Sequence, residues 1–160
     1  MNLLGNIFGE VCKTIFPITE ETYFGNPKCS TSICVLSSIS LLKKIANSEL
    51  MNNISLVGRL FSENKGIDSI IRYVNSNPKI DTIIICGKEV WGHKSGSSLL
   101  ALYKNGIDAN GRIINSISPD PYLSVTLQEV KKFQCRVRII NKIGIINFEK
   151  ISKLVHTIKN

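Results

Sequence analysis

A short stretch near the middle of the chain gathers residues that could do chemistry. It runs from Gly87 to Gly96 as Gly-Lys-Glu-Val-Trp-Gly-His-Lys-Ser-Gly and follows an apolar run that ends at Cys86. A neutral histidine such as His93 can bind a metal or move a proton, and a carboxylate such as Glu89 can orient it. Glycines let the backbone approach a ligand closely. The stretch therefore predicts a ligand or metal site on a loop.

The common loop motifs do not fit this stretch. Its glycines do not follow GxGxxG, Lys94 is not preceded by the glycine of a phosphate-binding P-loop, and the chain has no GxSxG. Cys86 and His93 are only two ligands, whereas a structural zinc site needs four. From the residues alone, His93 is either a ligand or a surface or capping residue. Glu89 is either its partner or a solvated loop acid.

The elements around this loop follow from hydrophobic periodicity. Residues 82–86 are apolar and β-branched, which is typical of a strand covered on both faces of a parallel sheet. Apolar or alternating patterns predict strands over 32–36, 54–58, 82–86 and 135–140, with a further short one at 113–114. Helical patterns predict helices over 39–46, 67–76, 95–104, 126–134 and 148–158.

The alternation of strands and helices indicates an α/β fold. We predict a single domain over 1–160 that forms a Rossmann-like three-layer sandwich with a mainly parallel sheet. Residues 1–28 contain Pro17, Gly25 and Pro27, so we expect an N-terminal arm with a short helix near Leu3 to Thr14.

Right-handed crossovers place the loops that follow parallel strands at one edge of the sheet. We therefore expect Ser37-Ser38, the turn at 62–65, the loop at 87–94 and the loop at 116–122 to converge. Small hydroxyl residues after a strand either leave backbone N–H groups open to a ligand or cap the next helix. Both uses remain open for Ser37 and Ser38.

Composition and charge limit the classes of function. The chain has 160 residues, 43% of them hydrophobic and 20% charged, with a net charge of +8. No apolar run approaches the roughly 20 residues that span a bilayer, and the N-terminus lacks a basic signal region, so we expect a cytoplasmic protein. The densest basic group is Lys131, Lys132, Arg136 and Arg138, with no aromatic residues interleaved. We therefore do not expect a nucleic-acid partner, but keep a basic nucleic-acid-binding α/β domain as an alternative.

The cysteines argue against a disulfide framework. There are five, and no pair has CxxC spacing. Cys34, Cys86 and Cys135 lie in or beside apolar runs, which predicts reduced, buried thiols.

Three blocks resemble the A subunit of tetrahydromethanopterin S-methyltransferase, the corrinoid-carrying component of the sodium-pumping methyltransferase of methanogens. They are Asn75 to Ile80 (NSNPKI), Ile84 to Gly96 (IICGKEVWGHKSG) and Ala101 to Asp108 (ALYKNGID). Order and spacing look similar from Gly66 to Gly144, and the similarity covers residues 24–145.

The resemblance implies a methyl carrier rather than a complete enzyme. Its cofactor would be a cobalamin (5-hydroxybenzimidazolyl or a related corrinoid), with His93 as the axial ligand to cobalt. The partners would be a methyl-donor or methyl-acceptor protein. We expect the corrinoid to be contacted by Ser37, Ser38, Asn64, Gly87, Glu89, Val90, Gly92, His93, Ser95, Gly96, Ser118 and Pro119.

Two departures from related patterns refine this expectation. The common cobalamin-binding pattern DxHxxG has an aspartate where Trp91 stands, so the partner of His93 must be Glu89 or another residue. The membrane-bound family member ends in a transmembrane helix, whereas this chain ends at Asn160 on an amphipathic pattern, so we expect a soluble homologue. A non-catalytic corrinoid store or regulatory module is the alternative.

Overall fold

A five-stranded mixed sheet lies at the centre of the molecule. The computed structural model describes residues 21–159, and the strands follow the order β1-β3-β2-β4-β5. β2, β3, β4 and β5 are parallel, and β1 runs antiparallel to β3. The strands are β1 (Thr22–Phe24), β2 (Thr31–Val35), β3 (Leu56–Arg59), β4 (Thr82–Gly87) and β5 (Arg138–Ile143). The helix expected near Leu3 to Thr14 lies outside the described residues.

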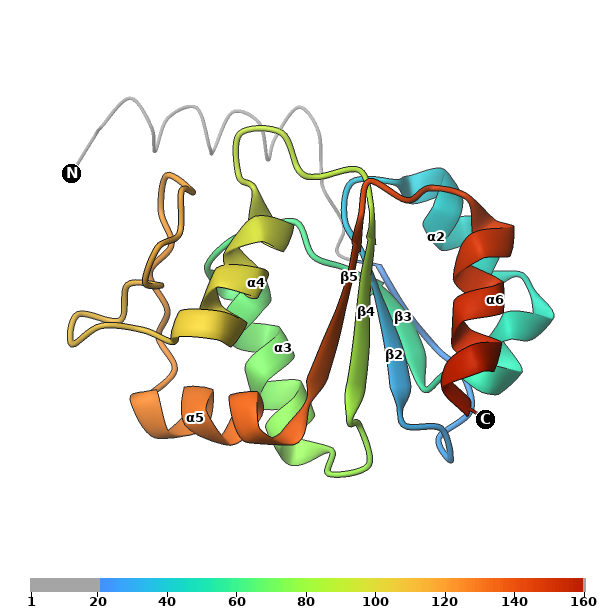
Figure 1. Ribbon diagram of the computed structural model, residues 1–160, viewed down its shortest axis with the longest axis horizontal. Coiled ribbons are helices and arrows are strands. Elements are labelled where there is room, and N and C mark those ends of the chain that lie inside the picture. The colour runs from blue at the N-terminus through green and yellow to red at the C-terminus, as the bar shows by residue number, and fades with distance from the viewer. Residues whose placement is uncertain (1–20, 160) are drawn as a thin grey trace.

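Helices cover both faces of this sheet (Figure 1). α3, α4 and α5 lie on one face, and α2 and α6 lie on the other. The helices are α2 (Ile39–Ala46), the 3-10 helix η1 (Glu49–Asn53), α3 (Lys65–Ser76), α4 (Ser95–Asn105), α5 (Leu127–Arg136) and α6 (Phe148–Lys159). The predicted α/β class with a mostly parallel sheet is confirmed.

β4 is an interior strand of the sheet, between β2 and β5, although the middle strand of the five is β2. All six of its residues are buried. Ile83 and Ile85 pack into the core beneath α3, α4 and α5, while Ile84 and Cys86 pack into the core beneath α2 and α6. Alternate side chains thus fill both layers, which explains why the strand is apolar throughout rather than alternating.

The last strand begins later than the sequence predicts. A strand was expected over 135–140, but α5 continues to Arg136 and β5 begins at Arg138. The Arg136 guanidinium donates to the carbonyl of Val74 at 3.0 Å, so this residue closes the carboxyl end of α3. The shift also places Cys135 on the surface, so the prediction of a buried thiol there is wrong.

Two short elements were not predicted, and one predicted strand is absent. β1 consists of three exposed residues, so no apolar pattern marks it within the expected arm at 1–28. η1 follows α2 as one further helical turn. Residues 113–114 form no strand, because Ile113 makes only an isolated bridge to Ile107.

The order of the parallel strands reverses between β2 and β4. The chain passes from β2 outward to β3 and then returns to the other side of β2 for β4. Such a reversal leaves a crevice beyond the carboxyl ends of the two strands, where ligands bind in open α/β sheets. The loops that begin at Ser37 and Lys88 leave the sheet at this point.

The thiols provide a test of this packing. Burial raises the pKa of the Cys86 thiol to about 12, and burial likewise raises the pKa of Cys34. Thiolate is the reactive form, so both cysteines should resist iodoacetamide at about pH 8 in the folded chain, while exposed Cys135 reacts. Peptide mass spectrometry after brief alkylation measures this. Rapid labelling of Cys86 before unfolding would contradict the packing.

Candidate functional site

The loop at 88–94 leaves β4 through a sharp turn at Gly87. Gly87 has a φ of +86°, which favours glycine. A Cβ there would lie 3.2 Å from both Cβ and Oγ of Ser38 and 3.2 Å from Cγ1 of Val35. The start of α2 therefore packs directly on the exit of β4.

Glu89 holds this loop to the first turn of α4. Its Oε1 accepts from the N–H groups of Val90 (2.8 Å) and Gly96 (3.0 Å). Its Oε2 accepts from the N–H (2.8 Å) and hydroxyl (2.9 Å) of Ser97. A carboxylate at a helix N-terminus also interacts favourably with the helix dipole. Glu89 is therefore neither the partner of His93 nor a solvated acid.

Several other expected contact residues also brace the loop. The Ser37 hydroxyl donates to the carbonyl of Lys88 (2.8 Å), and the Ser38 hydroxyl accepts from the Lys88 N–H (2.9 Å). Ser38 makes no side-chain bond to its own helix, so the capping interpretation is wrong for it. Ser95 is buried and its hydroxyl donates to the carbonyl of Leu60 (3.0 Å).

Gly96 lies in a tightly packed part of the site. A Cβ at this position would lie 2.7 Å from Cδ1 of Leu36 and 3.1 Å from Oε2 of Glu89. Val90 is buried beside it in the core beneath α4. By contrast, a Cβ on Gly92 would meet nothing within 4 Å, and Trp91 is 95% exposed. The tip of the loop around residues 91–92 is therefore open.

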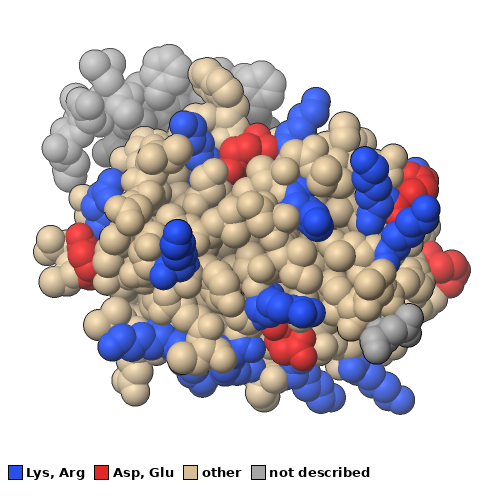
Figure 2. All heavy atoms as spheres, viewed as in Figure 1, with Lys and Arg blue, Asp and Glu red and all other residues tan. Residues whose placement is uncertain are grey.

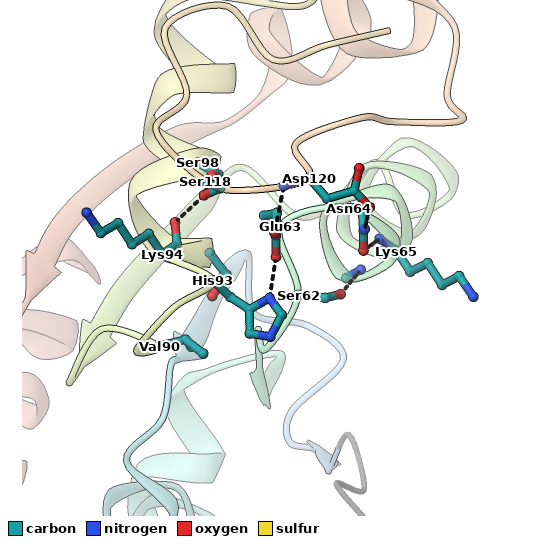
Figure 3. A network of polar contacts seen from close by, with 12 residues as sticks. Ser62, Glu63, Asn64, Lys65, Val90, His93, Lys94, Ser98, Ser118 and Asp120 are labelled. Atoms are coloured by element: carbon teal, nitrogen blue, oxygen red, sulfur yellow. Dashed lines mark hydrogen bonds and ion pairs between the residues drawn. The ribbon is translucent and has the colours of Figure 1, made fainter. Parts of the chain in front are cut away.

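His93 forms a close pair with Glu63, which follows β3. Nδ1 of His93 lies 2.8 Å from Oε2 of Glu63. The Glu63 side chain is 2% exposed, and the His93 side chain is 48% exposed. The other carboxylate oxygen of Glu63 accepts from the N–H of Asp120 at 3.2 Å. Figure 3 shows the imidazole and the carboxylate pointing toward one another from two different loops.

This pair leaves one imidazole nitrogen free. When His93 is neutral, the Glu63 carboxylate holds the proton on Nδ1, so Nε2 keeps its lone pair. Within residues 21–159, Nε2 has no hydrogen-bond partner. The Phe61 ring lies beside the imidazole, with centroids 5.9 Å apart. Histidines that bind metals commonly have a carboxylate on the second nitrogen, as here.

The expected loops do converge around His93. The Asn64 side chain caps α3 through the Lys65 N–H (2.6 Å) and donates to Asp120 (3.0 Å), which joins the 62–65 turn to the 116–122 loop. The buried Ser118 hydroxyl bonds to Ser98 and donates to the Lys94 carbonyl. Pro119 beside it is exposed.

The donor atoms near His93 limit the kind of metal group that the site could take. Among the described residues, no group of three or more His, Cys, Asp or Glu side chains could hold a metal ion unaided. A macrocycle fills most of the metal's coordination positions itself and needs an axial donor from the protein. His93 could supply one such nitrogen, and a Cβ on the neighbouring Gly92 would meet nothing within 4 Å.

Sequence reasoning missed Glu63 and Phe61. Both lie in the segment after β3, which the rule for parallel strands places at the same edge as the His93 loop. Glu63 is the carboxylate of the polar turn predicted at 62–65, so the rule for parallel strands could have identified it as a candidate site residue. Nothing in the spacing of the sequence predicts the contact between Phe61 and His93.

The densest basic group is partly engaged within the fold. The Lys132 ammonium donates to the carbonyl of Asn75 (3.3 Å), and Arg136 donates to carbonyls at the end of α3. Figure 2 shows Lys and Arg side chains spread over the viewed face rather than gathered in one patch. This arrangement gives no support to a nucleic-acid groove.

Comparison with known proteins places the chain in a family. Residues 11–160 match the family model that describes the A subunit of tetrahydromethanopterin S-methyltransferase. The chain belongs to this family. The resemblance seen in the sequence is thereby confirmed. Within residues 21–159, no helix combines the length and the apolar character needed to cross a membrane.

Curated relatives agree with this assignment. A protein of Methanosarcina barkeri named as the A subunit of the methyltransferase Mtx is 38% identical over 148 residues, which are 91% of this chain and 71% of that protein. The A subunit of tetrahydromethanopterin S-methyltransferase from Methanocaldococcus jannaschii is 32% identical over 146 residues, which are 90% of this chain. The match spans only 58% of that second relative.

Removal of the Glu89 carboxylate should destabilise the fold. We expect Glu89→Ala to lower the free energy of unfolding by about 2 to 4 kcal/mol, because three backbone N–H groups and one hydroxyl lose their acceptor. Urea denaturation followed by circular dichroism measures the change. Glu149→Ala is the matched control, since Glu149 is an exposed acid in a surface ion pair with Lys44, and it should change little. Equal effects of the two variants would contradict this account.

Proposed function

We propose that this chain binds a corrinoid and carries its methyl group, with Nε2 of His93 as the axial ligand to cobalt. The observation that most supports the proposal is the His93–Glu63 pair, which leaves Nε2 free at an open part of the rim. Membership of the methyltransferase family supports the same reaction class. A bound corrinoid would supply a cobalt centre that accepts and releases a methyl group.

The protein residues would orient the imidazole and leave Nε2 available as a donor atom. Glu63 holds the proton on Nδ1, which makes Nε2 the donor and increases its basicity. The Asp120 N–H satisfies the second oxygen of Glu63, so the buried carboxylate keeps a fixed orientation. The Phe61 ring, whose centroid lies 5.9 Å from that of the imidazole, would limit rotation of the imidazole ring.

The loop backbone would form the surface beneath the macrocycle. Glu89, Ser95 and Gly96 act indirectly, because they fix the path of the chain between Gly87 and α4. Strand order and the helices on both faces support a Rossmann-like three-layer sandwich, in which ligands bind beyond the carboxyl ends of the strands. A methyl-donor or methyl-acceptor protein is the partner that this role requires.

The two histidines of the chain allow a matched test of the axial ligand. The purified chain mixed with hydroxocobalamin should retain the corrinoid through gel filtration, and His93→Ala should alter the axial-ligand absorption bands. His156→Ala is the control, because His156 is exposed on α6 and its Nδ1 bonds to Ser152 of its own helix. If the wild-type chain retains no corrinoid, the proposal is wrong. Retention without methyl transfer from any methyl donor would instead indicate a store or regulatory module.

Glu63 should act through the geometry of His93. We expect Glu63→Gln to weaken coordination by His93 about 10- to 100-fold, because the amide lacks the charge that orients and polarises the imidazole. The measurement is the fraction of bound corrinoid with histidine ligation, titrated between about pH 5 and pH 8, where an unrestrained histidine gains its proton. Glu149→Gln is the control, since it makes the same change from acid to amide at an exposed residue of α6 that pairs with Lys44 rather than with His93. An unchanged titration in Glu63→Gln would contradict this role.

A further inference from the structure

The loop at 88–94 exposes large apolar side chains at the edge of the sheet that carries the site. Trp91, the only tryptophan of the chain, is 95% exposed. Ile117 is 69% exposed on a neighbouring loop, and the hydroxyl of the next residue, Ser118, donates to the carbonyl of Lys94 at 3.3 Å. Large side chains exposed beside a functional site are typical of an interaction surface.

An amphipathic stripe lies in the sequence that precedes the described residues. Five apolar residues recur there at i, i+3, i+4, i+7 and i+11, which is the spacing of one helix face, and they are Leu4, Ile7, Phe8, Val11 and Ile15. Polar residues such as Asn6 and Lys13 fall on the opposite face. A helix of about 12 residues is marginal in water unless its apolar face packs against another surface. The stripe therefore needs an apolar partner.

The chain before the described residues starts beside the His93 site. The carbonyl of Glu21 accepts from the N–H of Arg59, the last residue of β3, at 3.2 Å. Two residues further on, the Phe61 ring lies against the His93 imidazole, with centroids 5.9 Å apart. The five residues between Ile15 and Glu21 span at most about 17 Å when extended, which keeps the stripe near this edge of the sheet.

We propose that the apolar stripe of residues 4–15 docks on Trp91 and Ile117 and covers the open side of His93 in the ligand-free chain. The His93 side chain is 48% exposed to the described residues alone. The short tether gives the stripe an effective concentration of about millimolar at this surface, which favours it over a separate molecule. Burial of an aromatic side chain such as Trp91 removes about 150 to 250 Å² of surface from water.

The fluorescence of Trp91 reports on this contact, because no other tryptophan contributes to the emission. In the full chain without corrinoid, we expect emission at a shorter wavelength than that of N-acetyltryptophanamide and weaker quenching by acrylamide. Ile7→Asp places a charge within the stripe and should shift the emission to longer wavelength and strengthen the quenching. Asn6→Asp introduces the same side chain on the opposite face, so this matched control should behave as the wild-type chain does.

Chemical access to His93 gives a second measurement. Diethyl pyrocarbonate acylates neutral imidazole nitrogens, so a docked stripe should slow the modification of His93. We expect Ile7→Asp to raise the rate at His93 about 10-fold, which corresponds to a docking free energy of about 1.4 kcal/mol. The rate at His156 should not change, because that residue is exposed on α6.

Three results would overturn the proposal. Wild-type emission at the wavelength of N-acetyltryptophanamide would show that Trp91 is uncovered. Identical emission from the wild-type chain and Ile7→Asp would show that the stripe docks elsewhere. An emission shift that grows with protein concentration would assign the surface to a second copy of the chain. None of these measurements uses a corrinoid, so a chain that meets the expectations yet retains no corrinoid would contradict the proposed function alone.

Discussion

The Glu89 carboxylate is the contact on which the geometry of the site depends. The loop at 88–94 leaves a fully buried strand and must reach the N-terminus of α4 within seven residues. Glu89 accepts four hydrogen bonds from the loop and from the first turn of that helix. These bonds satisfy backbone donors that a helix N-terminus otherwise leaves unpaired. They also fix the path of the chain on both sides of His93.

A second carboxylate, Glu63, has a different task in a different environment. It is almost fully buried, and burial of a charge is costly unless the charge is paired and hydrogen-bonded. One of its oxygens faces His93 and the other accepts from Asp120. Glu63 thus joins loops from three parts of the chain and sets the orientation of an imidazole that is half exposed. Glu89 positions the loop, and Glu63 positions the side chain that the loop presents.

Local patterns were sufficient to predict much of this arrangement, and tertiary contacts explain what they missed. β4, the glycine exit at Gly87 and the start of α5, where the Thr126 hydroxyl accepts from the Glu129 N–H, are encoded in neighbouring residues. The partner of His93 could not be read from spacing, because Glu63 lies thirty residues away in sequence. Ser38 is a serine directly before a helix, a position typical of a helix cap, yet its hydroxyl accepts from the Lys88 N–H of the neighbouring loop. In such cases a long-range hydrogen bond overrides a local preference.

The central claim is that His93 supplies the axial nitrogen. Electron paramagnetic resonance of the chain loaded with a cobalt(II) corrinoid that lacks a nucleotide base tests it directly, because any axial nitrogen must then come from the protein. The account predicts splitting of the cobalt lines by one nitrogen nucleus in the wild-type chain and loss of that splitting in His93→Ala. Absence of nitrogen splitting in the wild-type chain, or its persistence in the variant, would contradict the account.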